Sequence, residues 1–425
     1  MTTSPLTQRI AELDDQLGEL AKPILVLKYL NWPDATEADF LESWRAGRPA
    51  LPVVKHCIPD WRSEIAALDN FVKLCEGDDP LLQFLRRSAW SYAEAARMLM
   101  SAGTAEFTSR SISLYGRPDD VYATQSFTGV DAAAFLLEKT EALLGGSHVA
   151  PSEAAEPAEQ FAVRLQNAID DYFVDDRVEV IVDNNLSSKA IAGTSRIRIR
   201  ASAIFTDLDF DQLYHHEALV HTATALNGRR QPRFKSLALG APRTTRTQEG
   251  LAVFAELMTR SIDINRLRRL ALRIQAIKVA LEGGDFIECF KVFLEAGQDE
   301  REAFKSAQRI FRGGDVNGRI VFTKDCVYLK GVMELHVFMN VAIRDNQPQL
   351  IERLFCGRLT ISDTITLAPY FDSGFLERPR YVPPWARDTR RLAAALAYSS
   401  FMMNVNLTPV TVERFVAATE LAELK

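Results

Sequence analysis

His216-Glu217-Ala218-Leu219-Val220-His221 is the stretch of this sequence that constrains the fold most strongly. The chain has 6 histidines among 425 residues, and His215, His216 and His221 lie within one short segment. Two histidines with a glutamate between them on one helix form the ligand pattern of a zinc site, although the usual spacing is four residues. A five-residue step rotates about 140° around an ideal helix, so both imidazoles reach one ion only if the turn holds an extra residue, as a π-bulge does. The alternative is a polar helix face with solvated histidines.

A zinc site also needs a third protein ligand and a position for water. Glu249 is the candidate, because it lies in Gln248-Glu249-Gly250-Leu251-Ala252, where a loop is expected to lead into a second helix. The small side chains of Gly250 and Ala252 would let this helix pack closely beside the histidine helix. Alone, Glu249 could also be an acidic residue that favours a helix N-terminus.

The composition narrows the class of protein. With 47% hydrophobic and 25% charged residues, the chain has the balance of a soluble globular protein. The net charge of -6 argues against a nucleic-acid partner, and the lack of a long uninterrupted apolar stretch argues against a membrane span. The first residues lack the pattern of a signal peptide, and the 5 scattered cysteines suggest reduced thiols, so we expect a cytoplasmic location.

The pattern of apolar residues predicts two domains. Helical spacing predicts an N-terminal helical lobe at residues 1–145, and a run rich in Ala, Glu and Pro predicts a linker at 146–157. Residues 158–425 are expected to form the second domain. The predicted fold class is α+β and mainly helical, with a small sheet next to the metal-binding helix.

The beginning of the second domain contains the strand signals. Strands are expected at 178–182, 189–192 and 196–200, from β-branched residues or from strict alternation of apolar and polar positions. A capping box formed by Thr206 and Asp209 would begin the histidine helix. Asn227-Gly228 would end it.

The predicted strand at 196–200 also carries three arginines on one face. If this strand lies at the edge of the cleft, a peptide substrate could pair with it, and we hypothesise that Arg196, Arg198 and Arg200 favour an acidic peptide tail. The alternative is an ordinary solvated strand face.

Three strings in one order carry a family resemblance. His216-Glu217-x-x-x-His221, Gln248-Glu249-Gly250-Leu251-Ala252 and Phe322-Thr323-Lys324-Asp325-x-x-Tyr328-Leu329-x-Gly331 together resemble the tyrosine/methionine carboxypeptidase family. That family includes the microtubule-associated tyrosine carboxypeptidases and bacterial proteins with the QEGLA string. The resemblance is clearest between residues 172 and 340. The eukaryotic relatives remove a C-terminal tyrosine from tubulin, but nothing in this sequence indicates that tubulin is its own substrate.

The resemblance implies a zincin-like metallopeptidase core in residues 158–425. Zn²⁺ would be held by His216, His221 and Glu249, and Glu217 would be the general base. The implied function is a zinc-dependent metallocarboxypeptidase that removes one residue, Tyr or another large apolar residue, from the C-terminal tail of a peptide or protein. The alternatives are an endopeptidase with the same chemistry, and a non-enzymatic regulatory or binding protein that keeps a zinc site on the same fold. Glu217 favours catalysis, because a structural site has no use for a base beside its first ligand.

Further groups are needed to stabilise an oxyanion and to bind the free α-carboxylate. Tyr328 is the candidate oxyanion donor, and on a helix it would share a face with Val332 and His336. Cations could bind the carboxylate. The candidates are Lys324 first, Arg312 second, and then Arg309, Arg319 and Arg246. Each cation could instead be a solvated surface charge, and Tyr328 and His336 could be core residues.

Overall fold

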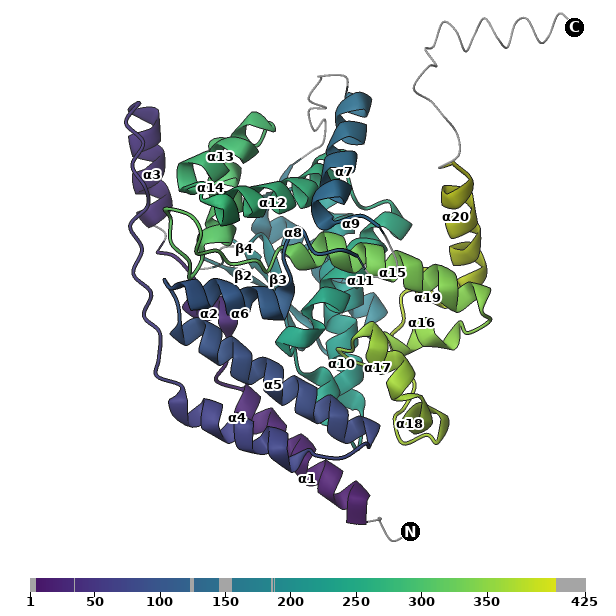
Figure 1. Ribbon diagram of the computed structural model, residues 1–425. Coiled ribbons are helices and arrows are strands. Elements are labelled where there is room, and N and C mark those ends of the chain that lie inside the picture. Colours follow the sequence, from purple (N-terminus) through teal and green to yellow (C-terminus); the bar gives the residue numbers. More distant parts are fainter. Residues whose placement is uncertain are drawn as a thin grey trace, which may run out of the picture.

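The computed structural model describes residues 5–33, 35–122, 126–144, 155–184, 186 and 188–402. This part of the chain is mainly helical and carries small sheets, so the predicted α+β class is confirmed (Figure 1). Residues 146–154 of the expected linker lie outside the described ranges, and the boundary between the two predicted domains stays a prediction.

Four of the N-terminal helices pack around one long helix, α5 (Pro80–Met100). This helix begins at Pro80, because the Asp79 side chain accepts hydrogen bonds from the backbone N–H groups of Leu81 and Leu82, and proline suits the first helical position. It contacts α1 (Pro5–Ala21), α2 (Val26–Tyr29), α4 (Arg62–Leu74) and α6 (Ala105–Tyr115). The other N-terminal helices are α3 (Ala35–Arg45) and α7 (Gly129–Leu144).

The main sheet has three strands in the order β2 (Glu179–Asp183), β4 (Arg196–Arg200) and β3 (Ala190–Ala192). β2 pairs parallel with β4, and β3 pairs antiparallel with it. β4 is therefore the central strand and is already paired on both sides, so the expectation that a peptide pairs with residues 196–200 is wrong. The alternation correctly indicated a half-buried strand, but it carries no information on strand order.

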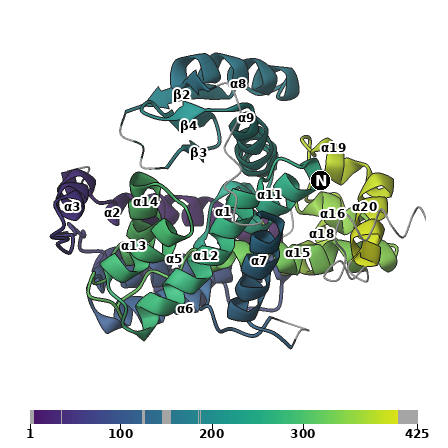
Figure 2. The same ribbon diagram turned by 90° about the horizontal axis from the view of Figure 1, so that it is seen from above.

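Helix α8 (Ala158–Tyr172) covers the outer face of this sheet (Figure 2). Phe161, Leu165 and Ile169 of the helix pack with Ile197 and Ile199 of β4 in a hydrophobic cluster of their own. A separate short pair joins β1 (Glu156–Pro157) to β5 (Ile204–Phe205). The edge strand β3 contacts the histidine helix.

The histidine helix is a continuous run of α9 (Asp207–Leu213), a π-helix η1 (Tyr214–Thr222) and α10 (Ala223–Arg230). The predicted capping box of Thr206 and Asp209 is confirmed at its start. The predicted end at Asn227-Gly228 is wrong, because the helix continues to Arg230. The Asn227 side chain bonds to the backbone of Phe355 and Tyr381 instead of stopping the helix.

The remaining helices complete a large hydrophobic core that also includes the N-terminal helices. They are η2 (Lys235–Ala238), η3 (Pro242–Thr244), α11 (Thr245–Thr259), α12 (Ile264–Glu282), α13 (Phe286–Glu295), α14 (Glu300–Phe311), α15 (Cys326–Arg344), α16 (Gln349–Arg353), α17 (Ile361–Thr366), α18 (Ala368–Asp372), α19 (Pro384–Arg387) and α20 (Thr389–Met402). Glycines set the crossing of α11 and α15, because a Cβ on Gly250 would overlap the Gly331 backbone. The missing side chain of Gly250 therefore allows the close approach of α15, and not of the histidine helix as expected.

Among the described helices, α15 is long and apolar enough by length and composition to cross a membrane. Half of its most apolar window is buried inside the protein. The core helix of a globular protein passes the same test, and α15 packs along α11 and contacts α12.

Candidate metal centre and active site

The π-helix brings the two histidines of the key string together. Residues five apart lie on one face of a helix with i→i+5 hydrogen bonds, so the extra residue that the spacing requires is present. The ring centroids of His216 and His221 are 4.9 Å apart, with their planes at 82°. The local geometry therefore agrees with the prediction that both rings can face one point only if the helix holds an extra residue in this turn.

Glu249 of α11 supplies the third group. Its Oε2 lies 3.8 Å from His216 Nε2 and 3.7 Å from His221 Nε2. The three ligand atoms all lie within 4.8 Å of one another. A tetrahedral zinc with bonds of about 2.0–2.1 Å holds its donors roughly 3.4 Å apart, so a small inward movement would suit this ion. The donor set of two imidazoles and one carboxylate thus fits zinc with an open position.

Glu256, which the sequence reasoning missed, orients the first histidine. Its carboxylate is fully buried on α11 and lies 2.6 Å from His216 Nδ1, which leaves Nε2 free to face the centre. Burial favours the neutral imidazole, but the hydrogen bond and charge of Glu256 prevail and raise the pKa of His216. Arg266 lies beside the same carboxylate. Burial of Glu256 would raise the pKa of this acid, but Arg266 and His216 outweigh burial and lower the pKa to about 2. A possible signal was the seven-residue spacing from Glu249, which places both acids on one helix face.

Glu217 lies at the side of this centre. Its Oε2 accepts a hydrogen bond from the backbone N–H of Ala192 on β3 at 2.9 Å. Its Oε1 lies 4.0 Å from His216 Nε2. The edge strand therefore holds one oxygen of the carboxylate and leaves the other beside the group of ligand atoms.

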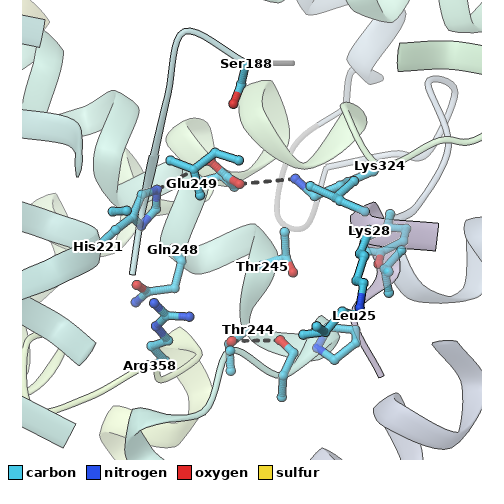
Figure 3. Close-up of a pocket in the computed structure, with 18 of the residues that line it drawn as sticks. Leu25, Lys28, Ser188, His221, Thr244, Thr245, Gln248, Glu249, Lys324 and Arg358 are labelled. Atoms are coloured by element: carbon cyan, nitrogen blue, oxygen red, sulfur yellow. Dashed lines mark hydrogen bonds and ion pairs between the residues drawn. The ribbon is translucent and has the colours of Figure 1, made fainter. Parts of the chain in front are cut away.

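These groups share one cavity of about 810 Å³ (Figure 3). The cavity is lined by His216, Glu217, His221 and Glu249 together with the predicted residues Tyr328, Lys324, Arg312 and Arg309. Arg319 and Arg246 are not among its lining residues, and neither is His336, whose ring lies 6.2 Å from that of Phe254. Arg198 lines the cavity, but Arg196 and Arg200 of the same strand do not.

The predicted cations have different surroundings. Lys324 Nζ lies 3.2 Å from Glu249 Oε1, on the oxygen that does not face the histidines. This contact and the two histidines outweigh burial and hold the pKa of Glu249 well below its usual range. Arg309 forms two hydrogen bonds with Asp325, at 2.6 and 2.7 Å, and lies 3.5 Å from the hydroxyl of Tyr328. Burial and the charge of Arg309 lower the pKa of Arg312 to about 10.

Several wall residues carried no sequence signal. Arg358 and Tyr92 come from segments far from the key strings, and only the folded chain brings them to the cavity. Residues 24–28 also form part of the wall, with Leu25 and Leu27 exposed by 51% and 40%. Gln248 lies within the QEGLA string, but nothing in the string distinguished it from its neighbours.

A comparison with protein families gives one match that covers most of the chain. A family model described as microtubule-associated tyrosine carboxypeptidase matches residues 38–404. This range includes the three strings and all four polar residues of the centre. No curated protein matches the chain. The matched range begins after the wall formed by residues 24–28.

Proposed function

Because the chain belongs to the microtubule-associated tyrosine carboxypeptidase family, we propose that it is a zinc-dependent carboxypeptidase with a zincin-like core. Membership of this family supports a carboxypeptidase activity. The observation that carries the zinc dependence is the convergence of His216, His221 and Glu249 beside Glu217. A bound zinc ion would lower the pKa of water toward about 7 and polarise the scissile carbonyl.

The protein's own groups would move the proton. Glu217 is held through Oε2 by Ala192, so Oε1 is free to take a proton from the attacking water and to pass it to the leaving amine. The Tyr328 hydroxyl can accept a hydrogen bond from Arg309 Nη2 and donate its own proton to the oxyanion. Lys324 and Glu256 would keep Glu249 and His216 in the orientation that ligation needs.

The substrate would be the C-terminal tail of a peptide or protein, with Tyr or another large apolar residue at its end. Three observations support this: the family description, a cavity of about 810 Å³ and the aromatic and aliphatic residues in its wall. Because β3 is the edge strand beside Glu217, we propose that the tail lies along β3, in place of the strand first expected to have this role.

The decisive test is the variant Glu217→Gln. Both proteins should hold about one zinc, since all three ligands remain. The wild type should shorten a Tyr-ended peptide by one residue, and the variant should be slower by roughly 10²- to 10⁴-fold, as expected for loss of a general base. Equal turnover by the two proteins would refute this mechanism.

Two controls separate the alternatives. A peptide with an amidated C-terminus should resist a carboxypeptidase, whereas an endopeptidase would cleave it. A wild-type protein that holds zinc but shortens no member of a peptide library would instead favour a non-enzymatic binding protein.

A further inference from the structure

Three of the six lysines and arginines that line the cavity already face an acidic group. Lys324 lies beside Glu249, and Arg198 Nη1 lies 3.2 Å from Asp183 Oδ2. Arg309 is bound by Asp325 through two hydrogen bonds. A substrate carboxylate would have to compete with these acids.

Arg358 differs from these cations. Within the part of the chain that the structure describes, its guanidinium makes no hydrogen bond and no ion pair, and its Nε is buried without an acceptor. The side chain lies over Gly240, where a Cβ would overlap Nη1. Arg358 is also close enough to Glu249 and Glu217 for their charges to oppose the lowering of its pKa by burial. It is therefore a cation beside the metal centre whose donors are still available.

Gln248 offers a second donor in the same wall. Its side chain is only 6% exposed, and its Oε1 lies 2.9 Å from the hydroxyl oxygen of Thr224, which orients the amide. The other end, Nε2, is buried and has no hydrogen-bond partner among the described residues. Gln248 directly precedes Glu249, and Figure 3 labels both with Arg358 on the cavity wall.

We infer that Arg358, with the amide of Gln248, binds the free α-carboxylate of the substrate. The inference rests on the proposed function and names the group that selects a chain end. Buried donors without acceptors are costly, and a planar guanidinium matches a carboxylate with two parallel hydrogen bonds. A carboxylate held here lies beside the ligand Glu249, which would bring the last peptide bond to the metal centre.

The test measures binding, so that turnover is not needed. In the zinc-loaded Glu217→Gln protein, fluorescence anisotropy compares a labelled Tyr-ended peptide with the same peptide as a C-terminal amide. The free acid should bind roughly 10- to 100-fold more tightly, which is the usual range for hydrogen bonds to a charged group. Adding Arg358→Gln should bring this ratio close to one, because it should weaken the binding of the free-acid peptide and leave the binding of the amide unchanged. Arg358→Lys should retain part of it, because lysine keeps the charge but not the paired donors.

Two further variants sharpen the result. Arg378→Gln makes the same change in charge on the surface outside the cavity and should leave the ratio unaltered. Arg312→Gln tests the cation that the sequence analysis placed second, after Lys324. If Arg312→Gln abolishes the preference for the acid and Arg358→Gln does not, the inference is overturned. Equal binding of acid and amide by the parent protein would overturn it as well.

Folding and function are judged separately. Thermal unfolding checks each variant, and if Arg358→Gln does not fold, Gly240→Ala gives the same test by displacing the guanidinium. Unchanged acid preference in a folded Gly240→Ala protein would then contradict the inference. The proposed function stands or falls on wild-type turnover, so a protein that shortens peptides without using Arg358 refutes only the carboxylate assignment.

Discussion

Replacing Glu256 by glutamine tests whether a buried acid behind the first histidine tunes the metal centre. The carboxylate contacts His216 Nδ1 at 2.6 Å and Arg266 at 3.1 and 3.2 Å. Glutamine has nearly the same shape and can still accept one hydrogen bond through its oxygen. The substitution therefore removes the negative charge while leaving the packing of α11 almost intact.

The expected magnitudes follow from these contacts. Loss of a group that orients a metal-bound histidine typically lowers metal affinity by about 10- to 100-fold, or roughly 1.4 to 2.7 kcal/mol. We expect the lower end, because the glutamine oxygen can still accept a hydrogen bond from the Nδ1–H group of His216. The metal-free protein should lose about 3 kcal/mol of unfolding free energy, since Arg266 is only 12% exposed and its guanidinium would lack a counter-ion.

Zinc affinity is measured for both proteins by competition with a chelator at about pH 8. Unfolding of the metal-free protein in urea gives the second quantity. Glu334→Gln is the matched control, because Glu334 pairs with Arg246 away from the cavity. Zinc affinity within twofold of wild type in a folded Glu256→Gln protein would refute the orienting role.

Three other predictions follow from the same geometry. Acidification should release zinc, because a protonated imidazole cannot bind the ion. Glu256 raises the pKa of His216, so the release should begin at a higher pH than for an ordinary histidine. A titration from about pH 8 to pH 5 with a zinc-binding dye would measure this release. Gly331→Ala should destabilise the protein by about 1–3 kcal/mol in urea, because its Cβ would overlap the Arg246 carbonyl oxygen, whereas Gly18→Ala, which meets nothing within 4 Å, should not. Replacing Leu25 and Leu27 together by serine should lower kcat/KM several-fold more for a Tyr-ended than for an Ala-ended peptide while zinc content is unchanged; an equal loss for both peptides would exclude a role in selectivity.

The segment with the histidines could be interpreted from sequence because its chemistry restricts its geometry. Two imidazoles five residues apart can share an ion only on a locally widened helix, and residues 214–222 form a π-helix. The capping box at Thr206 is similarly local, since it needs only a side chain and the backbone three residues later. Such features depend on neighbours in the chain and are visible without the rest of the fold.

The groups around the centre could not be predicted in this way. Arg358 comes from the segment after α16 and reaches the cavity only because that segment packs against residues 237–240. The order of the strands is equally non-local, because β4 pairs with β2 and β3 on opposite sides. Periodicity says which face of a strand is buried, but it does not say which strand lies beside it.

The two wrong local predictions have one physical cause. Glycine was taken as the end of a helix at Gly228, and Gly250 was taken as space for the histidine helix. At each position the missing side chain instead admits the backbone of a segment distant in sequence: a Cβ on Gly228 would lie 2.5 Å from the Leu237 carbonyl carbon, and one on Gly250 would overlap Gly331. A helix can continue through glycine at a cost of about 1 kcal/mol, which the close packing of the second segment can offset. Asn227 then gains four hydrogen bonds with the backbone of residues 355, 380 and 381, so the pair that usually ends a helix here joins it to the C-terminal region.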